Sequence, residues 1–151
     1  MDKTLINELG DELYQAMVQR ETVTPLTSRG FDISVEDAYH ISLRMLERRL
    51  ADGASIIGKK IGVTSKAVQN MLNVHQPDFG YLTDDMVFNS GEIMPISDRL
   101  IAPRAEGEIA FILKKDLSGP GVTNADVLAA TECVMPCFEI VDSRIQDGKI
   151  A

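Results

Sequence analysis

One strand-like stretch in the second half of the chain decides both the fold class and the candidate chemistry: Pro103-Arg104-Ala105-Glu106-Gly107-Glu108-Ile109-Ala110-Phe111. Side chains two residues apart in a strand project from the same face. Glu106 and Glu108 therefore present two carboxylates side by side. Gly107 has no side chain and lets a ligand or another backbone approach. We predict a strand over residues 105–114.

The rest of the second half is also β-like. The apolar runs Met86–Phe88 and Ile93–Ile96 flank Asn89-Ser90-Gly91-Glu92, a pattern that predicts a hairpin. A further strand is expected over Met135–Val141. In the first half, the glycine-punctuated run Ala54–Val63 predicts one short buried strand.

Four helices are expected, from apolar residues at helical spacing or from N-cap residues. They are Leu5–Gln19, a helix that Ser34 caps and Gly53 ends, Lys66–Leu72, and a helix from Thr123 to about Cys133. Ser34 and Asp37 have the spacing of a capping box, although aspartate is shorter than the usual glutamate. Asp126 suits the positive end of the last helix.

The order of these elements indicates an α+β protein. We expect a mainly helical N-terminal part over residues 1–75 and a β-rich part over residues 76–151. The last strands would present open edges, and the chain ends soon after a strand. We therefore expect this chain to be the front part of something longer.

Composition excludes several classes of protein. The 151 residues are 44% apolar and carry a net charge of −8, with a pI near 4.7. That balance excludes disordered, collagen-like and coiled-coil chains, and the negative charge repels nucleic acid. No run reaches a membrane span, and the N-terminus has no secretory signal. We expect a cytoplasmic protein whose two cysteines, Cys133 and Cys137, are reduced and lie in the core.

The paired carboxylates suggest a metal. Ala110 and Ile112 continue the glutamate face as an apolar one, so the two charges are costly there unless something pairs them. A divalent cation such as Mg²⁺ or Mn²⁺ would do so through hard oxygen ligands. Glu139, an acid within an apolar strand, is a third candidate ligand. The alternatives are the solvent face of an edge strand and an ordinary salt bridge for Glu139.

Lysines and a polar loop add candidate groups. Lys59 and Lys60 are adjacent in the expected strand, so one points inward and the other outward. An inward lysine near a metal could hold a carboxylate or enolate oxygen, or transfer a proton. The alternative is two surface lysines at a strand end. The loop His75–Gly80 brings a histidine and Asp78, whereas no G-x-S-x-G motif supports a serine hydrolase.

Three separated motifs carry a family resemblance: Gly58–Gln69 (GKKIGVTSKAVQ), His75–Gly80 (HQPDFG) and Pro103–Phe111 (PRAEGEIAF). From Met1 to about Asp147 the chain resembles the 2-hydroxypenta-2,4-dienoate hydratases, also called 2-oxopent-4-enoate or 2-keto-4-pentenoate hydratases. These belong to the hydratase/decarboxylase branch of the fumarylacetoacetate hydrolase superfamily. The resemblance implies a mixed β-roll, incomplete in this chain, with residues 76–151 as the first portion of the catalytic domain.

The resemblance also implies a site and a reaction. It implies Mg²⁺ or Mn²⁺ held by Glu106, Glu108 and Glu139, and catalytic roles for Lys60 and, as acid or base, Asp78. The implied reaction hydrates 2-hydroxypenta-2,4-dienoate to 4-hydroxy-2-oxopentanoate in the meta-cleavage degradation of aromatic compounds. The implied partners are the small 2-hydroxydienoate or 2-oxoacid substrate and further copies of the chain. Association with 4-oxalocrotonate decarboxylase is also implied.

Two other interpretations stay open. The sister 4-oxalocrotonate decarboxylase is similar, but it usually has leucine where Lys59 stands, a Pro-Ile-Tyr-Gly-like loop at residues 77–80 and Glu-Ala-Glu at residues 106–108. These differences favour the hydratase. The chain also departs from the family, which usually has tryptophan where Gly148 stands and continues well beyond Ala151. An inactive fragment that acts only as an interaction module is therefore the third interpretation.

Overall fold

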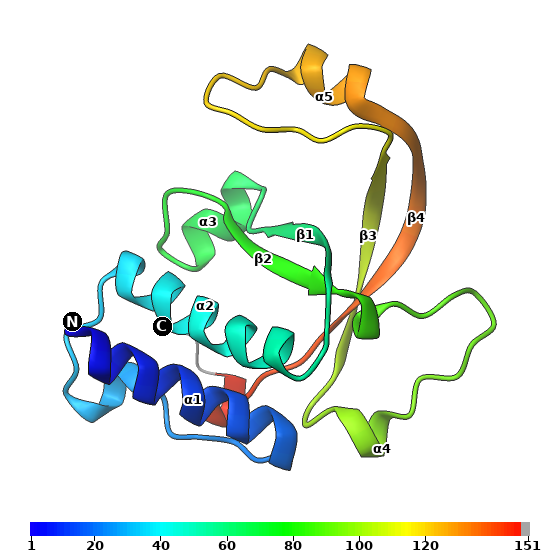
Figure 1. Cartoon of the computed structure of the whole chain (residues 1–151). Helices are drawn as coiled ribbons and strands as arrows, with labels where there is room; N and C mark the ends of the chain where they lie inside the picture. Colours follow the sequence, from blue (N-terminus) through cyan, green and yellow to red (C-terminus); the bar gives the residue numbers. More distant parts are fainter. Residues whose placement is uncertain (149–151) are drawn as a thin grey trace. The chain divides into compact units, whose positions relative to one another are not determined.

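The structure is a computed structural model that describes residues 1–148 (Figure 1). It has the predicted α+β character, with helices and two separate antiparallel two-stranded sheets in the described residues. The chain divides into two compact units, Met1–Ile101 with the segment from Ser143 onward, and Ala102–Asp142. The predicted division near residue 75 stays a prediction. The expected departure from the family at the chain end falls mostly on residues 149–151, outside the described residues.

Two long helices form the core of the first unit: α1 (Lys3–Gln19) and α2 (Val35–Ala51). They lie side by side in Figure 1. Their buried apolar residues are Leu9, Tyr14, Ala16, Ile41 and Leu46. Gly10 permits the close approach, because a Cβ there would lie 2.8 Å from the carbonyl oxygen of Ile41. No helix among the described residues is long and apolar enough to cross a membrane.

The predicted cap of α2 is confirmed. The Asp37 side chain reaches the backbone of Ser34, although it is shorter than glutamate. The amide of Asp37 donates to Ser34 Oγ at 3.1 Å. The amide of Ser34 donates in return to Asp37 Oδ2 at 3.0 Å. Because both bonds form, the capping box is complete and satisfies two backbone N–H groups at the start of the helix.

The first sheet pairs β1 (Ile56–Gly62) with β2 (Asp78–Thr83), and α3 (Lys66–Met71) lies between them in the sequence. One face of this sheet packs toward α2, where Tyr39 stacks on Phe79 with ring centroids 4.7 Å apart. The prediction of a buried β1 is wrong, since Ile61 is 64% exposed. A strand with one pairing partner in a two-stranded sheet leaves much of its surface open.

The predicted hairpin over residues 86–96 is wrong. The turn itself forms, because the amide of Asn89 donates to Glu92 Oε2 at 2.7 Å. The flanking residues, however, pair with no strand among the described residues. A short 3-10 helix, η2 (Asp84–Met86), precedes them, and a single helical turn, α4 (Ile96–Arg99), follows. Pro95 removes one of the backbone donors that a strand would need.

The second unit is a long ribbon of β3 (Arg104–Leu113) and β4 (Thr131–Val141), with α5 (Asn124–Ala130) before β4. Thr123 caps α5 as expected, and Asp126, expected only to suit the positive end of the helix, also completes a capping box like that of α2. The helix ends at Ala130, three residues before the predicted end at Cys133. Strand β4 begins at Thr131, four residues before the predicted start at Met135. The cause is that the last carbonyl of α5, at Ala130, accepts from the amide of Lys114 at 2.8 Å.

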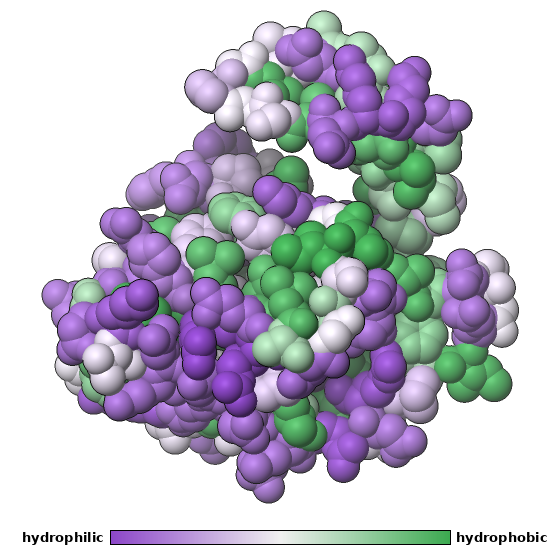
Figure 2. Space-filling model, in the orientation of Figure 1, coloured by the Kyte–Doolittle hydropathy of each residue, from purple (hydrophilic) through white to green (hydrophobic). Residues whose placement is uncertain are grey.

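Large apolar side chains on this ribbon are in solvent, among them Ile109 (65%) and Phe138 (78%). Figure 2 shows hydrophobic side chains at the molecular surface. Cys133 and Cys137 lie on β4 as free thiols, exposed and half-buried respectively, so the prediction that both are core residues is wrong. A two-stranded ribbon has too few layers to bury either of its faces.

Candidate functional site

The structure brings the three predicted glutamates together. Glu106 and Glu108 project from one face of β3, and the strand register places Glu106 directly opposite Glu139 of β4. One carboxylate oxygen from each residue lies within 4.8 Å of the others. Glu106 and Glu108 are exposed and Glu139 is half-buried. The cluster therefore joins two residues of one strand to one residue of its neighbour.

This donor set fits a divalent cation. Like charges directly opposite each other destabilise an antiparallel pair, and Glu106 and Glu139 form such a pair. A cation between them would turn this repulsion into attraction. Three carboxylate oxygens are the hard ligands that Mg²⁺, Mn²⁺ and Ca²⁺ accept. Gly107 leaves the space open, since a Cβ there would meet nothing within 4 Å.

Sequence reasoning missed one residue on this face. Cys137 pairs directly with Glu108 across the two strands, so its thiol shares the face of the carboxylates. The signal was present in the sequence, because Cys137 stands two residues before Glu139 and alternate residues of a strand share a face.

The first unit carries the other two predicted residues, Lys60 and Asp78. They lie on one face of the β1–β2 sheet, because Lys60 pairs with Gly80 and Gly62 pairs with Asp78. Lys60 is half-buried and Asp78 is exposed. Lys59 points to the opposite face, where its ammonium lies 5.3 Å from the centroid of the Tyr81 ring. The chain thus separates the two neighbouring lysines by strand alternation.

The two side-chain ends on this face lie close to Gly62. A Cβ built on Gly62 would be 2.4 Å from Asp78 Oδ1 and 3.0 Å from Lys60 Nζ. An ammonium and a carboxylate in this arrangement can donate to and accept from one polar molecule. His75, the other polar side chain of the predicted loop, is exposed and lies before the start of β2.

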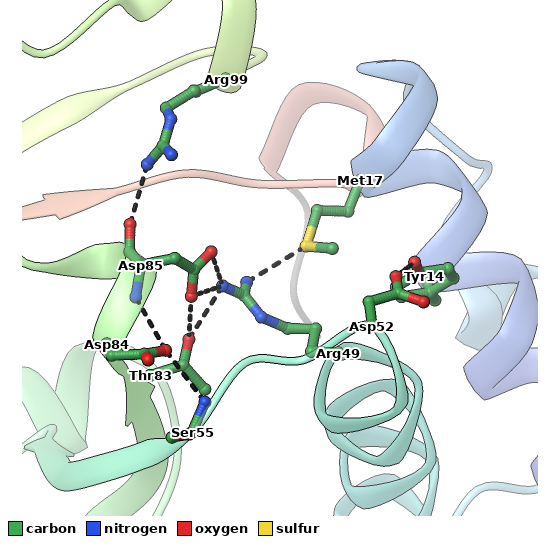
Figure 3. Close-up of polar contacts among 9 residues, drawn as sticks. All are labelled: Tyr14, Met17, Arg49, Asp52, Ser55, Thr83, Asp84, Asp85 and Arg99. Carbon is green, nitrogen blue, oxygen red and sulfur yellow. Dashed lines mark hydrogen bonds and ion pairs between the residues drawn. The ribbon is translucent and has the colours of Figure 1, made fainter.

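A polar cluster holds the end of β2, the strand that carries Asp78 (Figure 3). The guanidinium of Arg49 donates to Thr83 Oγ1 at 2.9 Å and to Asp85 Oδ2 at 2.7 Å. Thr83 is fully buried, and its hydroxyl also donates to Asp85 at 2.7 Å. Burial alone would raise the pKa of Asp85, but the hydrogen bonds from Thr83 and Arg49 outweigh it and lower that pKa.

Backbone and side-chain contacts extend this cluster. Arg99 donates to the carbonyl oxygen of Asp85 at 2.8 Å, and the amide of Ser55 donates to Asp84 at 2.9 Å (Figure 3). On the side of α1, Arg49 also contacts the sulfur of Met17 at 3.3 Å. Hydrogen bonds from or to charged side chains therefore link helix α2 to the end of β2, and the end of β2 to the start of β1.

Relatives of this chain are hydratases. It is 90% identical over 150 residues to a 2-hydroxypent-2,4-dienoate hydratase of Pseudomonas putida, a match that covers 99% of this chain and 68% of that relative. It is 63% identical over 150 residues to a 2-hydroxyhexa-2,4-dienoate hydratase of Comamonas testosteroni, with coverage of 99% and 57%. The chain therefore spans between about half and two thirds of the length of these relatives.

Two solved structures with the same fold are of a decarboxylase. The 4-oxalocrotonate decarboxylase from Pseudomonas putida G7, complexed with magnesium and adipate, matches with a TM-score of 0.92 and 30% identity. The match covers 99% of this chain and 56% of that one. The same enzyme complexed with calcium and acetate matches with a TM-score of 0.90.

No model of a protein family matches the chain. The sequence identity and the shared fold nevertheless agree with the three motifs and their order. The predicted family is confirmed, and the chain belongs to the 2-hydroxypenta-2,4-dienoate hydratases of the fumarylacetoacetate hydrolase superfamily.

Proposed function

We propose that this chain serves the hydration of 2-hydroxypenta-2,4-dienoate to 4-hydroxy-2-oxopentanoate in the meta-cleavage degradation of aromatic compounds. The observation that carries the proposal is the 90% identity to a hydratase named for this dienoate. The match extends over 99% of the chain, so the matched region spans the carboxylate cluster of β3 and β4 and the Lys60–Asp78 face. The proposal includes a cytoplasmic, homo-oligomeric protein that associates with the decarboxylase of the same family.

Glu106, Glu108 and Glu139 are the proposed metal ligands, for Mg²⁺ or Mn²⁺. Their mutual distances and their oxygen chemistry support this assignment, as do the magnesium and calcium complexes of the decarboxylase. When bound, such a cation supplies Lewis acidity that withdraws charge from the oxygens of a 2-oxo acid.

Lys60 and Asp78 are the proposed catalytic residues. In hydration of the dienoate, the 2-hydroxyl loses its proton as C5 gains one, and water then adds its hydroxyl at C4 and its proton at C3. The reaction therefore needs one group at the oxygen end of the substrate and one for the water. The Lys60 ammonium has three donors and no acceptor, which suits a carboxylate or the C2 oxygen. The Asp78 carboxylate accepts hydrogen bonds and can orient a water molecule or take its proton.

Decarboxylation is the second candidate reaction, and one observation favours it: the decarboxylase shares the fold with a TM-score of 0.92. The sequence of this chain is 30% identical to that of the decarboxylase and 90% identical to that of the hydratase. A shared fold does not fix the reaction, so the greater identity favours hydration.

The test is loss of the ultraviolet absorbance of the dienoate with this chain and Mg²⁺ or Mn²⁺. A chelator serves as control, and CO₂ is measured in parallel. Metal-dependent loss of absorbance without CO₂ supports hydration, whereas release of CO₂ from a 4-oxalocrotonate substrate supports the decarboxylase. No reaction with either substrate contradicts both activities for this chain. Co-elution with an intact relative would then favour an interaction module.

A further inference from the structure

We propose that Gly62 is a positioning residue for the reaction. Because it lacks a side chain, the Lys60 ammonium and the Asp78 carboxylate can share the space above it. This inference rests on the proposed function, since it concerns how the two proposed catalytic side chains are held. It adds a third residue that acts on the reaction only through them.

The face of the sheet around Gly62 has a regular pattern. On β1, Gly58, Lys60 and Gly62 alternate with residues of the other face, and on β2 their partners are Leu82, Gly80 and Asp78. The lysine and the aspartate are therefore diagonal neighbours, and each stands directly opposite a glycine. Diagonal neighbours on an antiparallel pair are within reach of a long side chain.

Distances show that both functional ends use this space. A Cβ on Gly62 would lie 2.4 Å from Asp78 Oδ1, closer than real Cβ contacts, and 3.0 Å from Lys60 Nζ. A methyl group there would have to displace both ends. The stem of Lys60 crosses the opposite glycine, because a Cβ on Gly80 would lie 3.3 Å from Lys60 Cγ and 3.5 Å from its Cδ.

Backbone geometry does not explain the glycine. Neither Gly62 nor Gly80 has a positive φ, unlike Gly53 at +103°. Any L-residue could adopt the backbone conformation of Gly62, and glycine within a strand carries an entropic cost. The contact atoms are also the far ends of flexible side chains, so alanine can be accommodated if those ends swing away. The expected effect of alanine is therefore a displaced pair in an intact fold.

The experiment compares Gly62→Ala with Gly58→Ala, a matched control on the same strand and face. A Cβ on Gly58 meets only Leu82 Cδ1, at an ordinary 3.8 Å. The first measurement is the rate at which an amine-acylating reagent labels Lys60, read by peptide mass spectrometry as a ratio to Lys59. Lys59 lies on the opposite face and is an internal reference. Circular dichroism and thermal melting verify the fold, and dienoate hydration gives kcat and KM.

The proposal predicts that Gly62→Ala folds normally, changes the Lys60-to-Lys59 labelling ratio at least threefold and lowers kcat/KM at least tenfold. In Gly58→Ala, the labelling ratio and kcat/KM should each stay within twofold of the values for the unmodified chain. A labelling ratio in Gly62→Ala equal to that of the unmodified chain would overturn the proposal, as would equal effects of the two variants. A purely structural role would not move this ratio in a folded chain.

Two further outcomes are distinguishable. If the unmodified chain hydrates no dienoate, the proposed function fails, and the labelling ratio alone decides whether Gly62 positions the pair. If Gly62→Ala does not fold, Gly80→Ala replaces it, because a methyl group there presses on the stem of Lys60 rather than on its end. A changed labelling ratio in Gly80→Ala supports the shared space, and an unchanged ratio contradicts it.

Discussion

The guanidinium of Arg49 hydrogen-bonds to residues at the end of β2. The Arg49 side chain is 11% exposed. It donates to Thr83, Asp85 and the sulfur of Met17, and Thr83 is fully buried. Its neighbour Arg48 is more open, at 43%, and makes a longer ion pair of 3.8 Å with Asp11. We therefore expect Arg49 to contribute more to folding stability than Arg48, because buried and hydrogen-bonded charges contribute more than exposed ones.

Arg49→Ala should lower the free energy of unfolding by about 1–3 kcal/mol, because it leaves the buried Thr83 hydroxyl and the Asp85 carboxylate without their cation. Arg48→Ala is the matched control and should cost less than about 1 kcal/mol. Urea denaturation followed by circular dichroism measures both. Equal losses for the two variants would contradict the assigned role of Arg49.

Lys60→Ala should lower kcat/KM for dienoate hydration by about 10²–10⁴-fold, since it removes the proposed donor at the oxygen end of the substrate. Lys59→Ala, which alters the opposite face, should change it less than threefold. Steady-state kinetics on both variants provides the measurement. Full activity of Lys60→Ala would remove Lys60 from the mechanism.

At the scale of elements, the helix starts were predictable because caps are local. Ser34 with Asp37, and Thr123 with Asp126, satisfy backbone donors within one turn of the chain. The strand limits and the absent hairpin were not predictable in this way. They depend on which distant segment supplies a hydrogen bond, as when Lys114 donates to Ala130.

Ser34→Ala should destabilise the chain by about 1 kcal/mol, the usual cost of losing an N-cap side chain. Ser28→Ala is a suitable control, because the Ser28 hydroxyl donates to the nearby Pro25 carbonyl at 2.7 Å in a 3-10 turn, η1 (Leu26–Arg29), and caps no α-helix among the described residues. The midpoints of thermal unfolding can be compared directly. The cap would be unimportant if Ser34→Ala melted together with Ser28→Ala.

The same helix start predicts a pH dependence. Hydrogen bonds from the Met1 amino group and from Ser34 lower the pKa of Asp37 from 3.8 to about 2. A lowered carboxyl pKa stabilises the folded state above about pH 4, and this contribution is lost as the pH falls toward 2. Nuclear magnetic resonance titration of the Asp37 carboxyl should give a midpoint near 2. A midpoint close to 4 would show that these contacts are absent in solution.

At the scale of the whole molecule, the sequence alone could show that the glutamates share a face, but not that they meet. Strand alternation predicts the pair Glu106 and Glu108, whereas the approach of Glu139 depends on the register between β3 and β4. The neighbourhood of Lys60 and Asp78 depends on strand pairing in the same way. Spacing suggested an inward lysine, but only the pairing of Gly62 with Asp78 shows what lies beside it.

Binding of a cation by the carboxylate cluster can be measured with Mn²⁺ by electron paramagnetic resonance. The variants are Glu139→Gln and, as control, Glu132→Gln, an exposed acid of the same strand outside the cluster. We predict one bound Mn²⁺ per chain, competition by Mg²⁺, and binding weakened about tenfold or more in Glu139→Gln but unchanged in Glu132→Gln. Absence of Mn²⁺ binding, or equal weakening in both variants, would show that Glu106, Glu108 and Glu139 do not form a cation site.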